Sequence, residues 1–175
     1  YHAPYGVTAQ EASARSGLIA HAPDITLLLL TYEDLHPELA NPVTGIDKEA
    51  QSLLRTKVLE RVATLLAAFR ALRTGYLVLS ILPPRSEPSL GIYDTQADRS
   101  ESRWRMQLNA DIADHLRESV KSTFLLDLDQ IVAQVGRRNF FDERLWYSAR
   151  FPFSADGGRE FARRIAAIGT ALKFP

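Results

Sequence analysis

Three short runs of almost uninterrupted apolar residues limit what this chain can fold into more than any other feature. They cover residues 25–30, 76–82 and 123–128. A strand with one face in water alternates apolar and polar residues, whereas a parallel strand covered by helices on both faces is apolar throughout. The runs therefore predict the strands of a mainly parallel sheet inside an α/β domain. The length of 175 residues suits one such domain.

Stretches of helical periodicity separate and follow these runs. Residues 47–73, 102–119 and 154–173 each place apolar side chains every three or four positions, which is the spacing of one helix face. Asp47 lies at the expected N-terminal end of the first helix, and Gly75 follows its expected end. Strands and helices that alternate at these lengths predict a three-layer sandwich with right-handed crossovers.

The first residues of the chain look like the end of a further strand. Residues 1–6 read YHAPYG, the first residue is Tyr1, and Met106 is the only methionine. We therefore expect the sheet to be missing its first strand in this stretch of sequence. That strand would lie upstream of Tyr1, and the centre of the sheet is its candidate position.

The composition excludes several classes of function. Lys and Arg number 21 and so do Asp and Glu, so a broad electrostatic attraction to nucleic acid or to an anionic membrane is not expected. The absence of Cys removes disulfides, thiolate nucleophiles and iron–sulfur clusters. The longest apolar run is too short to span a bilayer, and no signal segment opens the sequence. We expect a cytoplasmic protein that binds neither nucleic acid nor membrane.

Ligands of open α/β sheets bind beyond the carboxyl ends of the strands. Asp34 holds that position after the first run, and Tyr5 holds it if the opening is a strand end. Both are therefore candidate binding residues, although each could equally be a cap or turn former. The loop 83–99 after the second run is the longest irregular segment, and loops of this size often act as lids or binding segments.

The pair Asp127-x-Asp129 after the third run invites comparison with haloacid-dehalogenase (HAD) phosphatases. Those enzymes present a nucleophilic Asp and its acid/base partner at a strand end. They continue with Thr or Val where this chain has Ile131, and they need a downstream Lys, whereas the only Lys that follows here is Lys173. We therefore expect Asp129 to cap a short helix over 130–135.

A serine hydrolase triad is also missing from the sequence. There is no Gly-x-Ser-x-Gly motif, and the four histidines are His2, His21, His36 and His115. SGNH hydrolases keep a catalytic histidine three residues after an Asp near the C-terminus, and Leu145 stands at that place. Leucine is no base, so we assign no catalytic residue to this chain.

The segment 140–153 contains six aromatic residues interleaved with charged ones. It either packs aromatic rings over the sheet or forms a binding surface, and the residues alone leave both interpretations open. Basic and aromatic residues together can bind single-stranded nucleic acid, but the neutral net charge argues against that use.

Residues 141–154 read FDERLWYSARFPFS, which resembles the FD-x-RLWY-x-A-R-x-PFS stretch of FkbH-like proteins. Three other pieces agree with that family in order and spacing: APYG at 3–6, APD at 22–24 and FLLDLD at 124–129. The resemblance covers most of the chain. It implies a single SGNH-like α/β domain over residues 1–175, followed beyond residue 175 by a HAD-type phosphatase domain that uses Mg.

The resemblance also implies a function in polyketide-type biosynthesis. FkbH-like proteins take a glyceryl unit from bisphosphoglycerate, remove its phosphate and load the unit on the phosphopantetheine thiol of an acyl carrier protein. This chain would then be a non-catalytic accessory domain without a cofactor of its own. Its partners would be its own HAD catalytic domain and the acyl carrier protein.

Four residues of the motif are candidates for binding. Arg144 and Arg150 could clamp a phosphate or carboxylate, because guanidinium groups bind such oxygens in pairs, and Trp146 and Tyr147 would form a contact face. All four could equally lie in a domain interface. Two other functions stay open: an SGNH-type esterase or acyl hydrolase whose nucleophile lies upstream, and a module that only docks a carrier protein.

Overall fold

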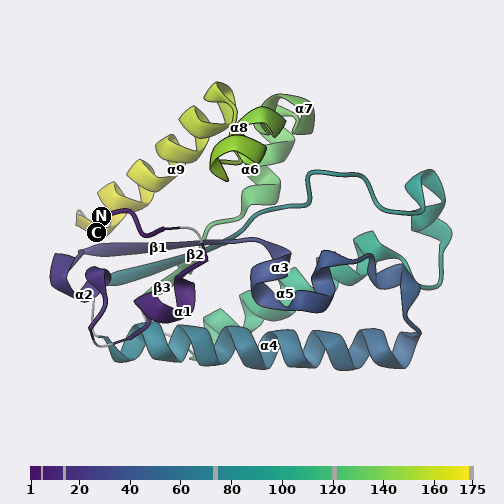
Figure 1. Cartoon of the computed structure of the whole chain (residues 1–175), viewed down its shortest axis with the longest axis horizontal. Coiled ribbons are helices and arrows are strands. Elements are labelled where there is room, and N and C mark those ends of the chain that lie inside the picture. The colour runs from purple at the N-terminus through teal and green to yellow at the C-terminus, as the bar shows by residue number, and fades with distance from the viewer. Residues whose placement is uncertain (5, 14, 73–74, 120–121, 174–175) are drawn as a thin grey trace. The chain divides into compact units, whose positions relative to one another are not determined.

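The computed structural model describes the chain except for residues 5, 14, 73–74, 120–121 and 174–175 (Figure 1). The chain divides into two compact units, Tyr1–Leu126 and Asp127–Pro175. The first unit contains the sheet. The second consists of helices, with an isolated β-bridge that pairs Phe141 with Phe153.

The first unit is built on a parallel sheet, as the apolar runs predict. Its strands among the described residues are β1 (Ile25–Leu30), β2 (Tyr76–Ile81) and β3 (Thr123–Leu125), in the order β1, β2, β3. β1 and β2 pair along their whole length, and β3 pairs with β2 on its other side. β3 is shorter than its apolar run because Asp127 already caps the following helix.

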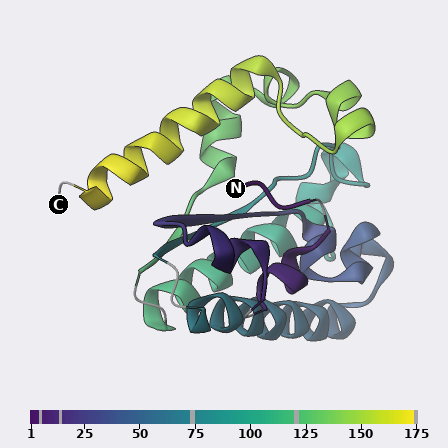
Figure 2. The same ribbon diagram turned by 60° about the vertical axis from the view of Figure 1, so that its left-hand side comes forward.

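Two long helices connect the strands and lie on one side of the sheet (Figures 1 and 2). α4 (Lys48–Ala71) connects β1 to β2, and α5 (Glu101–Ser119) connects β2 to β3. The Asp47 carboxylate caps α4 by accepting the Ala50 N–H at 2.8 Å, as the sequence indicates. The apolar stripes of both helices are buried: Leu54, Val58, Val62, Leu66 and Phe69 on α4, and Trp104, Leu108, Ile112 and Leu116 on α5.

Short helices complete the first unit. α1 (Thr8–Glu11) and α2 (Gly17–His21) precede β1. After β1 come α3 (Tyr32–Leu35) and the 3-10 helices η1 (Pro37–Ala40) and η2 (Val43–Gly45), and a further 3-10 helix, η3 (Gly91–Gln96), lies in the loop between β2 and α5.

The opening residues do not form the strand end that the sequence suggests. Residues 1–4 and 6–7 have no strand assignment, and Tyr5 lies outside the described residues. The Tyr1 hydroxyl donates to Glu11 Oε1 at 2.7 Å, and its ring lies beside His21, so contacts with α1 and α2 hold this segment instead. β1 and β2 pair directly, so the central position considered for a further strand is closed in this structure.

The second unit contains α6 (Leu128–Val135), α7 (Arg137–Phe140), α8 (Glu143–Ala149) and α9 (Ala155–Lys173). Aromatic rings form much of its interior. Phe153 lies edge-on to Phe140 at 5.3 Å between ring centres and stacks on Phe161 at 4.8 Å. Within this unit, several aromatic residues of 140–153 therefore pack against one another. No helix in the described part of the chain is both long and apolar enough to cross a membrane.

Gly75 should not tolerate a side chain. A Cβ at this position would lie 1.9 Å from the Asp24 carbonyl oxygen. That oxygen accepts the Tyr76 N–H at 2.7 Å, where the pairing of β1 and β2 begins. We expect Gly75→Ala to lower the free energy of unfolding by about 2 kcal/mol, as measured by urea denaturation.

Gly45→Ala is the matched control, because no atom lies within 4 Å of a Cβ built at Gly45. It should leave the free energy of unfolding unchanged or raise it by up to about 1 kcal/mol, since alanine restricts the unfolded chain. Equal stabilities of the two variants would contradict the close approach at Gly75.

Candidate functional site

Asp34, a predicted binding residue at the carboxyl end of β1, belongs to a capping box at the start of α3. Thr31 Oγ1 accepts the Asp34 N–H at 3.3 Å. Asp34 Oδ2 accepts the Thr31 N–H at 2.7 Å and the Thr31 hydroxyl at 2.9 Å. These bonds satisfy backbone groups that the short helix leaves unpaired. The carboxylate thus has a structural role, and a binding role for it stays a prediction.

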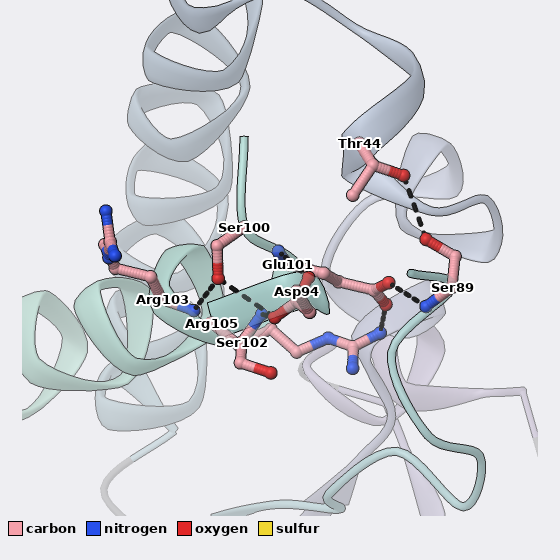
Figure 3. Close-up of polar contacts among 8 residues, drawn as sticks. All are labelled: Thr44, Ser89, Asp94, Ser100, Glu101, Ser102, Arg103 and Arg105. Carbon is pink, nitrogen blue, oxygen red and sulfur yellow. Dashed lines mark hydrogen bonds and ion pairs between the residues drawn. The ribbon is translucent and has the colours of Figure 1, made fainter. Parts of the chain in front are cut away.

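The long loop after β2 is anchored to the N-terminus of α5 by Asp94 (Figure 3). One carboxylate oxygen accepts the Glu101 N–H at 2.8 Å, and the other accepts the Ser102 N–H at 3.0 Å and the Ser100 hydroxyl at 2.9 Å. Ser100 Oγ in turn accepts the Arg103 N–H at 3.1 Å. The first three N–H groups of α5, which have no partner within the helix, are therefore all satisfied.

Glu101 extends this network toward the rest of the loop. Its buried carboxylate accepts the Ser89 N–H at 3.0 Å and forms an ion pair with Arg105 one turn along the helix. The Ser89 hydroxyl is hydrogen-bonded to that of Thr44 at 2.9 Å, which connects the loop to η2 (Figure 3). We call this network the loop anchor; it consists of Thr44, Ser89, Asp94, Ser100, Glu101, Ser102 and Arg105.

The charge of Asp94 is stabilised by the groups that surround it. Its side chain is only 1% exposed, and this burial acts to raise its pKa. The hydrogen bonds from the Ser102 and Glu101 backbone, followed by those from the Ser102 and Ser100 side chains, outweigh burial and hold the pKa of Asp94 below its ordinary value. Asp94 is therefore ionised at neutral pH and binds the loop as a carboxylate.

The loop anchor also contacts α3, the short helix that follows β1. The Arg105 guanidinium lies 5.4 Å from the centre of the Tyr32 ring, and the Tyr32 hydroxyl donates to Asn109 Oδ1 at 3.1 Å. The sequence marks the loop 83–99 as a candidate binding segment, but its pattern does not reveal Asp94, Glu101 or the ion pair of Glu101 with Arg105. The one available signal is a serine directly before a helical apolar stripe, which is typical of an N-cap.

In the second unit, the motif that carries the family resemblance folds back on itself. Phe141 and Phe153 form an antiparallel bridge. Beside it, the Asp142 N–H donates to the Pro152 carbonyl at 3.0 Å. The motif therefore closes a loop around α8.

Two polar residues of the motif start helices. Asp142 Oδ1 accepts the Leu145 N–H at 2.9 Å at the start of α8. Ser154 Oγ accepts the Gly157 N–H at 3.0 Å at the start of α9. A Cβ at Gly157 would lie 2.4 Å from the Phe140 carbonyl oxygen, so a glycine there lets α9 approach α7 closely. Much of the motif is explained by local folding.

The structure brings two of the predicted motif residues together. Arg150 ends α8 with a left-handed φ of 54°, and its N–H donates to the Trp146 carbonyl at 2.9 Å. Its guanidinium carbon lies 5.3 Å from the centre of the Trp146 ring, within the range of a cation–π interaction. Trp146 is itself buried, at 8% exposure.

The other two predicted residues, Arg144 and Tyr147, lie on the surface of α8, and Tyr147 is 74% exposed. Arg144 is in the first turn and Arg150 is the C-cap, so the two are about 9 Å apart along the helix axis. One small oxyanion would have to draw both long side chains toward the middle of the helix. Whether they bind a ligand stays a prediction.

Asp127 is the N-cap of the short helix α6, so the prediction that Asp129 caps this helix is wrong. Asp127 Oδ1 accepts the Gln130 N–H at 3.2 Å, and the helix begins at Leu128. The physical reason is that β3 ends at Leu125, so the extended backbone needed for an N-cap occurs two residues earlier than expected. The candidate Tyr5 lies outside the described residues.

Within the described residues, no three His, Asp or Glu side chains lie close enough together to hold a metal ion. These residues therefore do not fit the Mg that the family resemblance implies.

Comparison with known proteins shows a likeness of fold. No family model and no curated protein matches this chain. The chain is similar to a crystal structure of the N-terminal part of the protein BF1531 from Bacteroides fragilis, which contains a phosphatase domain and is complexed with Mg. The identity is 17% and the TM-score 0.65, and the match covers 89% of this chain and 39% of that one. The predicted α/β fold is confirmed, and the chain spans about two fifths of that solved structure.

Replacing Asp94 should loosen the loop anchor in a pH-dependent way. We expect Asp94→Asn to lower the free energy of unfolding at pH 7 by about 1 to 2 kcal/mol, because an amide cannot accept all the bonds of the carboxylate. The pKa of Asp94 is lower in the folded than in the unfolded chain, so its contribution is present above about pH 4 and is lost as the pH falls further. Urea denaturation at pH 7 and at pH 3 should show a smaller difference between wild type and variant at pH 3.

Asp98→Asn is the control for this experiment. The Asp98 side chain is 91% exposed and lies 3.6 Å from the ammonium of Lys48, so its loss should change the free energy of unfolding by less than about 0.5 kcal/mol. An equal effect of Asp94→Asn at both pH values, or an effect no larger than that of Asp98→Asn, would show that the anchor does not depend on a charged Asp94.

Proposed function

We propose that this chain is the non-catalytic α/β region of an FkbH-like phosphatase that loads a glyceryl unit on an acyl carrier protein. The observation that carries the proposal is the combination of the FDERLWYSARFPFS motif with the fold of a fragment that contains a phosphatase domain. The match covers most of this chain but less than half of that fragment, as expected if catalysis belongs to a neighbouring domain.

The residues of this chain support an accessory role. Leu145 occupies the place of the SGNH histidine, and Asp127 of the Asp-x-Asp pair is an N-cap. The motif residues Asp142 and Ser154 start helices. Phosphate removal from bisphosphoglycerate, with Mg, is the task of the HAD-type domain expected beyond residue 175. This region would position that domain or the carrier protein.

The exposed surface of α8 is our candidate for the binding site of the carrier's phosphopantetheine arm. The arm contains a phosphate diester, and Arg144 offers an exposed guanidinium that has no ion pair with any described residue. Tyr147 lies on the same short helix and offers an exposed ring for the apolar part of the arm. Arg150, stacked on Trp146, is the second cation of this surface.

If this chain is non-catalytic and a neighbouring domain is the phosphatase, only a protein that includes that domain should release phosphate. The chain alone, incubated with bisphosphoglycerate and Mg, should release no phosphate above the background in a colorimetric phosphate assay. The same chain extended through the domain beyond residue 175 should release phosphate. Release by the chain alone would contradict a non-catalytic role, and hydrolysis of p-nitrophenyl acetate by a form extended upstream would favour the esterase instead.

The role of α8 predicts a difference between two forms of the carrier protein. Arg144→Ala should weaken binding of a holo-acyl carrier protein several-fold, with a smaller effect at high salt, while binding of the apo form, which has no arm, stays unchanged. Isothermal titration calorimetry measures both. Arg159→Ala in α9 is the control, because Arg159 is an exposed arginine of the same unit that pairs with Asp156. Equal effects on the holo and apo forms would contradict recognition of the arm.

A further inference from the structure

The first unit presents three large apolar side chains on the loop between β2 and α5. Ile92 is 85% exposed, Tyr93 72% and Leu90 43%. They lie at the start of η3 and just before it. We call these three residues the docking turn. Large apolar and aromatic residues that gather on a surface in this way mark interaction sites more often than isolated ones do.

The docking turn is held in one conformation by groups below it. Asp94, the next residue, is fixed by its bonds to the start of α5. The Ala97 N–H donates to the Tyr93 carbonyl at 3.1 Å, and the Thr95 hydroxyl donates to the Ile92 carbonyl at 3.4 Å. Just before the turn, the Ser89 N–H is bound by Glu101. Because the backbone is already ordered, a partner that binds these side chains loses little affinity to the ordering of the loop.

Positive charge accompanies the docking turn. The Arg103 guanidinium donates to the Thr95 carbonyl at 3.3 Å, and that of Arg99 donates to the Ile46 carbonyl at 3.2 Å. Both arginines are exposed, and neither has a carboxylate partner among the described residues. The nearby Asp98 is paired with Lys48. Two guanidinium groups without a carboxylate partner among the described residues therefore lie close in sequence to the docking turn, and that of Arg103 contacts the carbonyl of Thr95 in the same 3-10 helix, η3.

We infer that the docking turn, together with Arg99 and Arg103, binds a protein surface that has an apolar groove bordered by carboxylates. This inference rests on the proposed function, under which the partner is the body of the acyl carrier protein. The apolar side chains enter the groove, and the arginines face its carboxylates. A lipid surface is less favoured, because the net charge of the chain is zero and two arginines add only weak attraction to anionic lipid.

The test uses the full chain and the apo form of an acyl carrier protein, so that the arm does not contribute. Ile92→Ser combined with Tyr93→Ser should weaken binding about tenfold or more in isothermal titration calorimetry. Arg99→Glu combined with Arg103→Glu should weaken it by a similar factor and abolish its dependence on salt. All four side chains are exposed, and unchanged urea midpoints would show that the variants fold.

Leu53→Ser and Lys57→Glu on α4 are the matched controls, because both residues are exposed and belong to a different element. They should bind the apo carrier protein as wild type does. Binding of the apo carrier protein by the double variants at wild-type affinity would overturn the docking turn and leave the proposed function standing.

The proposed function itself has a separate test. If the wild-type chain bound neither form of the carrier protein, and the extended protein released no phosphate, the proposed function would be overturned as well. A third outcome would assign the docking turn to a membrane and overturn the inference. In that outcome the wild-type chain binds vesicles of anionic lipid but no carrier protein, and the Ile92→Ser, Tyr93→Ser double variant does not bind the vesicles.

Discussion

The direct pairing of β1 with β2 is the constraint on which the rest of the first unit depends. Both strands run in the same direction, so the chain must cross back between them, and α4 makes this crossing with its apolar stripe against the sheet. The second crossing, by α5, repeats the arrangement. The carboxyl ends of the strands then meet at one edge of the sheet. α3 and the long loop after β2 both start from that edge.

The start of α5 determines the shape of that loop. A helix leaves its first N–H groups without partners, and here a buried carboxylate from the loop itself satisfies two of them. Asp94 is costly to bury as a charge, but its hydrogen bonds compensate for the burial. One consequence is that the residues next to Asp94 are ordered although they face solvent. Another is that Ile92 and Tyr93 stay exposed, because Asp94 and not an apolar contact holds the turn.

The motif of the second unit combines folding and exposure. Its aromatic bridge, its two caps and the stacking of Arg150 on Trp146 are local requirements of a small helical unit. Arg144 and Tyr147 of the same motif lie on the surface. Most residues of the motif therefore have a role in the folding of the second unit. The function that we propose for the motif depends on its exposed side chains, those of Arg144 and Tyr147.

Local physical chemistry determines what the sequence by itself could predict. The apolar runs define strands, the stripes define α4, α5 and α9, and Asp47 marks the start of α4, because each depends on residues that are neighbours in the sequence. The ends of β3, the cap at Asp127 and the lack of a strand at residues 1–4 and 6–7 were decided by where strands find partners, which the local pattern does not contain. Asp94 and Glu101 reach groups up to a dozen residues away, so only the tertiary structure assembled the loop anchor. The exposure of Ile92 and Tyr93 was likewise decided in three dimensions, since an apolar side chain in a loop is buried or presented according to what folds over it.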